Sequence, residues 1–344
     1  MNYYEIIENN CKLHSPVKWW PRFAYHYTDV ENAASILSDG FIYSRNDAIE
    51  SKRMKNDNAS RQVINMTDDT ITGKVRFYFR PLTPTQYHNE GFKHPEIRYR
   101  QDCYANVPVP VFFLFDLNEL LVQPGVQFSE KSQAGWGSEL FSSPEEFEKM
   151  NFDKIYENGP MEDPEVDKKY RHAEIISQNS FPVDTCLKYV LCRNNIERLT
   201  LLNLLRNLDN RLFLKYKDCI QVCNNNLFYN NGIYLSDCRY YEGSASITIE
   251  DKWSKTNYLN KQKRVMGIDE LAMLNAEIEF IWKKSRNILS KESCRFQIDY
   301  ENSTLISFHG LTKPSNANVL YTKVSIEGKL MCYMSQQLSA SALL

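Results

Sequence analysis

The sequence has no long hydrophobic run. Its longest apolar stretch, Val107 to Leu117, is interrupted by Pro108, Pro110 and Asp116, and it is too short for a membrane-spanning helix, which takes about 20 residues. The first residues, Met1 to Glu5, have neither the basic cluster nor the apolar segment of a signal peptide. We therefore expect a soluble, cytoplasmic protein that does not act on a membrane.

The sequence also has little net charge. Its 41 Lys and Arg residues and its 43 Asp and Glu residues leave a formal net charge of −2. This balance argues against a protein that binds polyanions over its whole surface, but it allows a local basic groove. With 42% hydrophobic and 13% aromatic residues among 344, the chain can bury a substantial core, and its length predicts one large or two medium domains.

The nine cysteines lack the spacing of a disulfide framework. They are scattered and odd in number, which indicates reduced thiols in a reducing compartment. Cys219 and Cys223 stand four residues apart with Cys238 downstream, so a zinc site has to be considered. No histidine lies nearby in the sequence and no second cysteine pair supplies the remaining ligands, so buried or incidental thiols are the favoured interpretation. We predict no metal site.

The first half of the chain contains clear signals for helices and strands. Thr28 or Asp29 can cap a helix that ends at Gly40, and Ser143-Pro144 followed by Glu146 predicts a helix that continues towards Tyr156. Apolar, β-prone runs predict buried strands at residues 75–79, 109–115, 173–176 and 186–192.

The character of the sequence changes after about residue 194. A leucine-rich helical face lies within 196–208, and apolar positions at helical spacing predict another helix within 268–288. Residues 319–334 alternate around Glu327-Gly328, which predicts a hairpin. We therefore expect one domain at residues 1–195 and an α+β extension of unknown role at residues 196–344.

Two residues of the first half are candidates for chemistry. Glu174 lies in a strand-like segment, where a buried carboxylate is costly unless it has a partner or a task. A solvent-facing glutamate on an amphipathic strand is the alternative, and the local pattern alone favours it. His26 lies between two tyrosines just before a helix start, where its imidazole could bind a ligand. A purely structural histidine is the alternative there.

A charged stretch from Arg45 to Arg61 could bind phosphates. Arginines in this turn-rich setting can clamp a pyrophosphate or nucleic-acid phosphates with two parallel hydrogen bonds. Between residues 45 and 80 there are eight Lys or Arg residues and five Asp or Glu residues, so a solvated loop of mixed charge is an equal alternative. Tyr78, on the expected strand 75–79, could stack on a ring of the ligand.

Taken in order, these segments resemble the DarT family of NAD-dependent ADP-ribosyltransferase toxins, which modify nucleic-acid bases. Residues 25–28 (YHYT) and 36–40 (ILSDG) match the family's tyrosine-histidine-x-threonine segment and the "I-L-x-x-G" helix after it. Residues 75–87 match the strand "V-P-F-Y-F-x-P-R-S-P-M-L-Y", and residues 172–175 (HAEI) match the "Q-A-E-F/I" context of the catalytic glutamate. The match covers roughly residues 20–195.

The sequence departs from the family pattern within the strand motif. Arg76 stands where the motif has proline, Leu82-Thr83 replaces "R-S", and Thr85-Gln86 replaces "M-L". Residues around this loop are plausible contacts to the acceptor. The departures therefore leave open which base, and which nucleic acid, the protein modifies.

The resemblance implies an α+β fold, with an ADP-ribosyltransferase-type split β-sheet core around a cleft for NAD+, the ADP-ribose donor. It implies that Glu174 is catalytic and that an arginine of the charged stretch acts at the reaction centre, with Arg53 the best fit and Arg61 the substitute. The residues implied to bind NAD+ are His26, Thr28, Arg45 and Tyr78.

The function implied is the transfer of one ADP-ribose from NAD+ to a nucleobase of single-stranded DNA or RNA. A base inside a duplex is hard to reach, so a single-stranded acceptor is favoured, with bases stacked on aromatic residues such as Tyr87, Phe92 or Tyr99. The implied role is a toxin held in check by an antitoxin, in anti-phage defence, with a chaperone as a further partner.

Three other functions stay open. The first is ADP-ribosylation of a protein. The second is a phosphotransferase-like reaction on RNA ends, which an intact Glu174 disfavours. The third is a non-catalytic binding module that keeps the fold, which intact His26, Arg53 and Glu174 disfavour.

Overall fold

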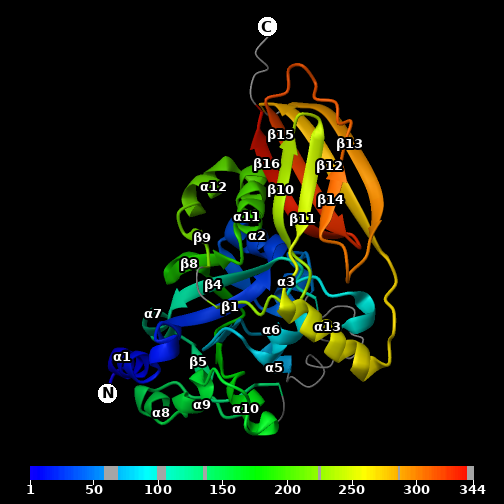
Figure 1. Cartoon of the computed structure of the whole chain (residues 1–344). Helices are drawn as coiled ribbons and strands as arrows, with labels where there is room; N and C mark the ends of the chain where they lie inside the picture. Colours follow the sequence, from blue (N-terminus) through cyan, green and yellow to red (C-terminus); the bar gives the residue numbers. More distant parts are fainter. Residues whose placement is uncertain (58–68, 99–105, 135–137, 224–225, 286, 339–344) are drawn as a thin grey trace.

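The computed structural model of the chain describes residues 1–57, 69–98, 106–134, 138–223, 226–285 and 287–338. It confirms the expected α+β class: helices surround a seven-stranded sheet in the first part, and strands dominate the second part (Figure 1).

The seven-stranded sheet organises the first part. In spatial order its strands are β5 (Gln127–Ser129), β6 (Glu174–Ile176), β3 (Arg76–Tyr78), β1 (Phe23–Asp29), β4 (Pro110–Asp116), β8 (Leu187–Cys192) and β9 (Ile220–Val222). All neighbours are antiparallel except β8 and β9. A separate pair consists of β2 (Phe41–Tyr43) and β7 (Ser180–Pro182).

Two neighbouring strands of this sheet diverge. β1 pairs with β4 along its whole length, from Phe23 opposite Asp116 to Asp29 opposite Pro110. In contrast, β1 pairs with β3 at a single position, Tyr25 opposite Tyr78. Beyond Tyr25, β1 is therefore not paired with β3, and a space opens between the two strands.

Helices and short 3₁₀ segments pack around the sheet. The α-helices before residue 220 are α1 (Tyr3–Leu13), α2 (Val30–Asp39), α3 (Arg45–Glu50), α5 (Asp69–Thr72), α6 (Pro84–Asn89), α7 (Leu117–Leu121), α8 (Pro144–Glu148), α9 (Phe152–Tyr156), α10 (Pro164–Tyr170), α11 (Asn195–Leu208) and α12 (Asn210–Tyr216). The 3₁₀ segments are Ser15–Val17, Trp20–Arg22, Pro95–Ile97 and Val183–Thr185.

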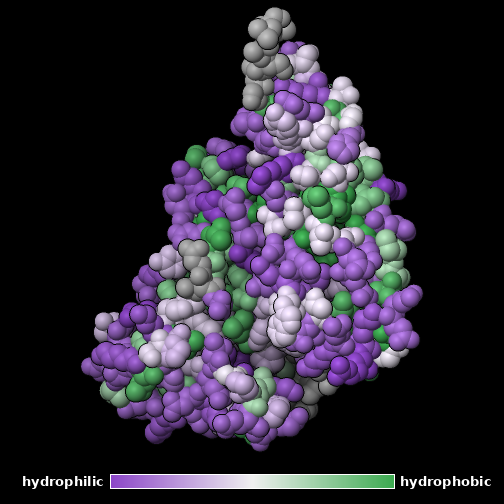
Figure 2. All heavy atoms as spheres, viewed as in Figure 1, coloured by the Kyte–Doolittle hydropathy of each residue, from purple (hydrophilic) through white to green (hydrophobic). Residues whose placement is uncertain are grey.

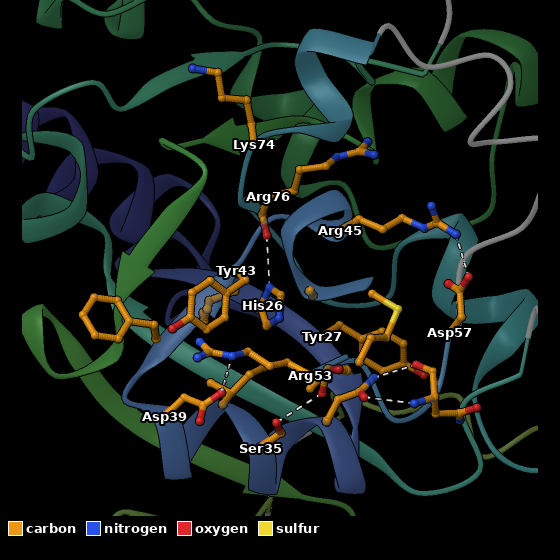
Figure 3. Close-up of a pocket in the computed structure, with 18 of the residues that line it drawn as sticks. His26, Tyr27, Ser35, Asp39, Tyr43, Arg45, Arg53, Asp57, Lys74 and Arg76 are labelled. Carbon is orange, nitrogen blue, oxygen red and sulfur yellow. Dashed lines mark hydrogen bonds and ion pairs between the residues drawn. The ribbon is translucent and has the colours of Figure 1, made fainter. Parts of the chain in front are cut away.

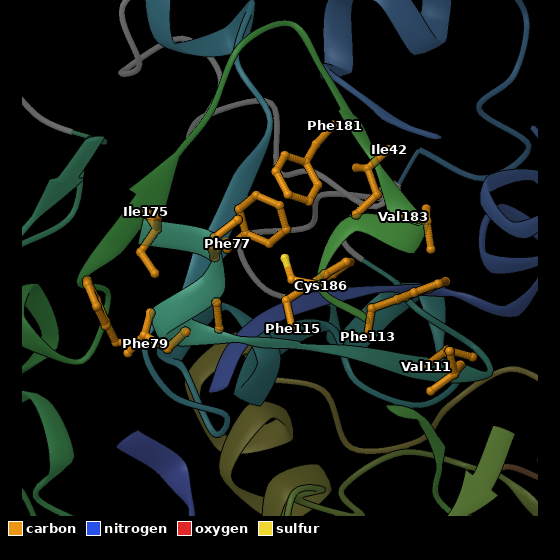
Figure 4. Close-up of a cluster of buried hydrophobic side chains, with 14 of the residues drawn as sticks. Ile42, Phe77, Phe79, Val111, Phe113, Phe115, Ile175, Phe181, Val183 and Cys186 are labelled. Atoms are coloured by element: carbon orange, nitrogen blue, oxygen red, sulfur yellow. The ribbon is translucent and has the colours of Figure 1, made fainter. Parts of the chain in front are cut away.

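Aromatic residues fill the core on one face of the sheet. Phe77 of β3 meets Phe115 of β4 and Phe181 of β7, with ring centroids 5.2 and 5.4 Å apart (Figure 4). All three side chains are at most 3% exposed. Because β7 belongs to the separate strand pair, this cluster fixes that pair against the main sheet.

Most of the predicted elements are confirmed. The strands expected at 75–79, 109–115, 173–176 and 186–192 correspond to β3, β4, β6 and β8, and the helix expected within 196–208 is α11. The capping box at Ser143 is present, but its helix ends at Glu148, and a second helix, α9, covers the residues up to Tyr156.

The second part is built from two sheets. One contains β10 (Leu235–Tyr241), β11 (Ser244–Ile249) and β14 (Leu305–Phe308), and the other contains β13 (Asn287–Ile298), β12 (Leu274–Lys284), β15 (Val319–Ile326) and β16 (Lys329–Gln337). Helix α13 (Trp253–Met266) precedes β12. The predicted hairpin is confirmed: Glu327 and Gly328 connect β15 to β16 with φ values of 48° and 70°, the left-handed conformation of tight hairpin turns.

The helix predicted within residues 268–288 is wrong. That segment holds β12, in which the buried side chains recur at every second residue: Leu274, Ala276, Ile278, Phe280 and Trp282. A subset of apolar positions, at 274, 278 and 281, also fits helical spacing, and this coincidence misled the sequence interpretation.

The junction between the two parts runs through α11. Leu201 and Leu205 of this helix lie in the first core, whereas Ile196 lies in the second. Its Asn203 side chain donates to the Tyr333 carbonyl of β16 at 2.9 Å. Strand β9, after residue 195, also joins the first sheet. The first sheet therefore contains strands from both sides of the expected boundary at residue 195. The division into two domains at that residue stays a prediction.

The visible surface is largely hydrophilic, with small groups of apolar side chains among the polar ones (Figure 2). Within the described residues, none of the helices has the length and the apolar character needed to cross a membrane. In the same residues, no cluster of three or more His, Cys, Asp or Glu side chains is placed to hold a metal ion.

Candidate active site

A cavity of about 250 Å³ opens where β1 and β3 diverge. One wall, the strand wall, consists of β1 residues 26–28 with Lys74, Arg76 and Tyr78 from β3 and the residues before it. The opposite wall, the helix wall, comes from α2, β2, α3 and the segment up to Asp57 (Figure 3). The cavity therefore gathers residues from at least five helices and strands of the first part.

The turn from β1 into α2 positions the first cavity residues. Asp29 is the N-cap of α2 and accepts a hydrogen bond from the Glu31 amide at 3.0 Å, and Gly40 ends the helix with a φ of 75°. The sequence left the cap open between Thr28 and Asp29. Because Asp29 takes that role, the side chain of Thr28, which is 6% exposed, is left to line the cavity.

His26 is held in one tautomer. Its Nδ1 lies 3.1 Å from the Arg76 carbonyl oxygen, and since a carbonyl only accepts, Nδ1 carries the proton (Figure 3). Burial lowers the pKa of His26, with the Arg76 carbonyl opposing this shift. A neutral imidazole with its proton on Nδ1 keeps Nε2 as an acceptor, which suits a ribose hydroxyl or a carboxamide N–H.

Two arginines stand on the helix wall. Arg45 at the start of α3 donates from Nη2 to the Asp57 Oδ2 at 2.6 Å. Arg53 lies over the Tyr43 ring, 4.3 Å from its centroid, and its Nε lies 3.5 Å from Asp39 Oδ2. The two side chains are partly exposed, at 26% for Arg45 and 40% for Arg53, which leaves room for a phosphate to reach them.

Hydrogen bonds with Asn32 and Lys329 hold the segment that follows Arg53. The side-chain oxygen of Asn32 on α2 accepts the amides of Lys55 and Asn56, and its Nδ2 donates to the Asn56 carbonyl. Lys329, from the second part of the chain, donates to Asn56 Oδ1 at 2.6 Å. The helix wall is thus stabilised in part by the first residue of β16.

Glu174 on β6 forms a two-point ion pair with Arg76 on β3. Arg76 Nε donates to Oε2 at 2.8 Å and Nη2 donates to Oε1 at 2.6 Å. The glutamate side chain is 1% exposed, whereas that of Arg76 is 24% exposed. The solvent-facing alternative for Glu174 is therefore wrong: its carboxylate is buried, and a cation neutralises it.

The sheet register brings these side chains together. Glu174 lies opposite Tyr78, and Arg76 precedes Tyr78 by two residues, so the three side chains share one face. Burial lowers the pKa of Arg76, but the charge of Glu174, the charge of Tyr78 and the hydrogen bond to Glu174 together outweigh it, so the net shift is upward. Burial raises the pKa of Tyr78, Arg76 opposes this, and Glu174 adds to it. Arg76 thus stays a cation and Tyr78 a neutral phenol at neutral pH.

Five of the six predicted site residues line the cavity: His26, Thr28, Arg45, Arg53 and Tyr78. Glu174 does not line it and is connected to it through Arg76. Arg61, the substitute for Arg53, lies outside the described residues, as does Tyr99. Phe92 is fully buried in the second core, so the expectation that it stacks on a base is wrong.

A family model matches residues 25–217, more than half of the chain, and its description is "ssDNA thymidine ADP-ribosyltransferase, DarT". The chain belongs to the DarT family. It is an NAD-dependent ADP-ribosyltransferase, and the matched region runs from β1 through α12.

Solved DarT structures are similar to this chain at low identity. Thermus sp. 2.9 DarT in complex with carba-NAD+ has 16% identity and a TM-score of 0.47, and covers 61% of this chain and 98% of its own. Thermus sp. 2.9 DarT in complex with ADP-ribosylated ssDNA has 14% identity and the same TM-score, covering 61% and 97%. Thermosipho africanus DarTG in complex with ADP-ribose has 14% identity and a TM-score of 0.43, covering 56% and 51%. Direct comparison with curated protein sequences finds no match.

The sequence does not predict the ion pair between Arg76 and Glu174. Arg76 is a departure from the strand motif, in the place of a proline, and its partner lies 98 residues away in the sequence. It also missed Asp39, Tyr43 and Asp57, which hold the two helix-wall arginines. No local pattern marks these residues, because their contacts depend on the pairing of distant elements.

Proposed function

We propose that this DarT domain binds NAD+ in the cavity between the two walls and transfers its ADP-ribose to thymidine in single-stranded DNA. The observation that carries the proposal is the buried Arg76–Glu174 pair beside a cavity lined by His26, Arg45 and Arg53. The family description supplies the acceptor class. The role of each side chain follows from its position on one of the two walls.

The helix wall would hold the donor. Arg45 and Arg53 are the partly exposed cations that can take the pyrophosphate, and Thr28 and His26 offer polar groups to a ribose. Tyr78 presents an aromatic ring on the opposite side. A dinucleotide held by both walls would place its nicotinamide–ribose bond near the strand wall.

The strand wall would carry the chemistry. When the bond from ribose C1′ to nicotinamide breaks, nicotinamide leaves with the electron pair and positive charge develops on the ribose, as in glycoside hydrolysis. The Glu174 carboxylate can stabilise that charge and accept the proton of the base nitrogen, which forms the new bond to C1′. The products are nicotinamide, the ADP-ribosylated base and one proton.

We further propose that the protein is a toxin with a cognate antitoxin, as the resemblance to the family suggests. RNA as an acceptor, a chaperone partner and a role against phage stay predictions. Expression of the active chain in bacteria should stop growth, and E174Q should restore it. Growth arrest by E174Q at equal protein level would contradict a toxicity that depends on transfer.

Labelled NAD+ tests the proposed function directly. The protein is incubated with NAD+ labelled in the adenylate moiety and with single-stranded DNA, duplex DNA, RNA or a protein extract. Label should appear in single-stranded DNA that contains thymidine and not in the same DNA lacking it. Label in protein alone would favour the alternative of a protein ADP-ribosyltransferase, and intact NAD+ with every acceptor would favour a non-catalytic module.

A further inference from the structure

Arg76, and not Glu174, is the member of the ion pair that lines the cavity. Glu174 is 1% exposed, and both of its oxygens accept from the Arg76 guanidinium. Arg76 itself lines the cavity. Any ligand in the cavity therefore meets Arg76 before it meets Glu174.

We propose that Arg76 is a positioning residue for Glu174, whose carboxylate it pairs with its own positive charge and holds in one orientation beside the cavity. This inference rests on the proposed function, in which Glu174 is catalytic. The planar fork of arginine matches the two carboxylate oxygens, and it fixes the orientation of the group as well as its charge.

No other cation contacts the carboxylate among the described residues. From the loop after β5, the Ser132 hydroxyl and the Gln133 amide lie 3.4 Å from Oε1, and both are uncharged. The titratable groups that face the pair are Tyr78, from β3, and His172, just before β6. Arg76 is thus the one side chain that supplies positive charge to Glu174 by direct contact in this part of the structure.

His172 does not replace that charge. Burial lowers its pKa to about 4, with the Lys168 carbonyl opposing this and the charges of Arg76 and Arg80 adding to it. His172 Nε2 lies 2.9 Å from the Thr85 hydroxyl, and Nδ1 lies 3.1 Å from the Lys168 carbonyl. It is therefore neutral above about pH 5, so a change in rate between pH 5.5 and 8.5 would not come from His172.

Removal of the cation has a defined consequence. A buried carboxylate without a counter-charge takes up a proton at higher pH, by about 1–3 pH units for the loss of one close cation. A protonated Glu174 can neither accept a proton nor stabilise the positive ribose. The acid limb of the rate profile should therefore move to higher pH when Arg76 is neutralised.

The test measures kcat/KM for transfer between pH 5.5 and 8.5 in the full chain. In R76Q the acid limb should move up by about 1–3 pH units, so that the ratio of the R76Q rate to the wild-type rate falls as the pH is lowered. The matched control is R211Q, which removes an arginine that is 90% exposed on α12, and it should reproduce the wild-type profile.

A second variant, R76K, separates the effect of the positive charge at residue 76 from that of the two-point hydrogen bonding. It also provides a test if R76Q does not fold. R76K keeps a cation but lacks the fork, so its acid limb should stay within one pH unit of the wild type while kcat falls about tenfold and KM for NAD+ changes little. An R76Q acid limb that superimposes on that of the wild type, or an R76K kcat equal to that of the wild type, would overturn the inference. If the wild type itself transfers nothing, the proposed function fails first, which distinguishes the two failures.

Discussion

The two walls of the cavity hold their charges in different ways. On the strand wall, Arg76 and Glu174 are placed by the register of β3 and β6, and the carboxylate is 1% exposed. On the helix wall, Arg45 and Arg53 are 26% and 40% exposed and are held by single carboxylates and one ring. Backbone pairing thus fixes the groups proposed for chemistry, whereas side-chain contacts hold the groups proposed for the donor.

This contrast suits the strand wall to catalysis and the helix wall to binding of the donor. Groups that stabilise a developing charge act best when they are oriented before the ligand arrives. Groups that bind a flexible dinucleotide gain from partial exposure, because they can turn from their present partners to its phosphates. Variants on the strand wall should therefore lower kcat, and variants on the helix wall should act mainly on KM.

The largest effect is expected from E174Q. Loss of the carboxylate should lower kcat by about 10²–10³-fold, while the Kd for NAD+ changes less than threefold because the donor contacts lie on other residues. Single-turnover transfer rates and calorimetric titration with NAD+ measure the two quantities. E165Q, on the exposed first turn of α10, is the matched control and should behave as the wild type. A tenfold weaker NAD+ affinity in E174Q would contradict the proposal that the strand wall serves catalysis and the helix wall binds the donor.

R53A is expected to have the next largest effect. Arg53 can donate to a charged oxygen of the donor, and the loss of such a bond corresponds to about 10–100-fold in kcat/KM. Steady-state transfer at varied NAD+ shows how this loss divides between kcat and KM. Because Arg53 lies on the helix wall, we expect most of this loss in KM. A substantial fall in kcat would contradict the donor role and would favour the sequence prediction, which has Arg53 at the reaction centre.

R45A tests the helix wall at its other arginine. A cation that binds the pyrophosphate equally in the ground state and the transition state raises KM without lowering kcat. We expect KM for NAD+ to rise about tenfold, as for one charge-assisted hydrogen bond. D57A, which removes the partner of Arg45 and leaves the cation, should change KM far less. A similar rise in both variants would show that the pair matters for structure and not for the donor.

A smaller effect is expected at the contact between the second part of the chain and the helix wall. K329A removes the hydrogen bond to Asn56 and should raise KM for NAD+ about two- to tenfold, as for one hydrogen bond, with kcat unchanged. K291A, which breaks the ion pair between the exposed Lys291 and Glu279 of β12, is the control. If both variants behave as the wild type, the second part does not support the cavity through Lys329.

The smallest effect is a pH dependence of stability at the point where the two walls meet. Burial raises the pKa of Asp29 from 3.8 to about 7, with its hydrogen bond from Glu31 opposing this. The folded protein therefore holds a proton that the unfolded chain releases above about pH 4. The free energy of unfolding contributed by this group falls as pH rises from about 4 to about 7. Chemical denaturation of D29N, which keeps a capping oxygen, should show a flatter profile in this window than the wild type. Parallel profiles would contradict the shift.

Much of the fold could be predicted because its signals are local. Asp29 and Gly40 mark the two ends of α2, and a turn at Glu327-Gly328 marks the last hairpin. The helix predicted across β12 failed because a few apolar positions fit periods of both 2 and 3.6 residues.

The sequence identified residues that the structure brings together, but it did not predict their contacts. Motifs identified His26, Arg45, Arg53, Tyr78 and Glu174, and the structure places four of them around one cavity. The pairing of Glu174 with Arg76 depends on the register of two strands 98 residues apart, which no local pattern encodes. The same holds for the support of Asn56 by Lys329, because these residues come from different parts of the chain.

The most direct test of the account is the mass of a single-stranded oligonucleotide that contains one thymidine, after incubation with the full chain and saturating NAD+. We predict that the wild type adds the mass of one ADP-ribose to this oligonucleotide, that E174Q adds none in the same time, and that an oligonucleotide with cytidine in place of the thymidine stays unmodified. Equal modification by E174Q, or no modification by the wild type, would contradict the account.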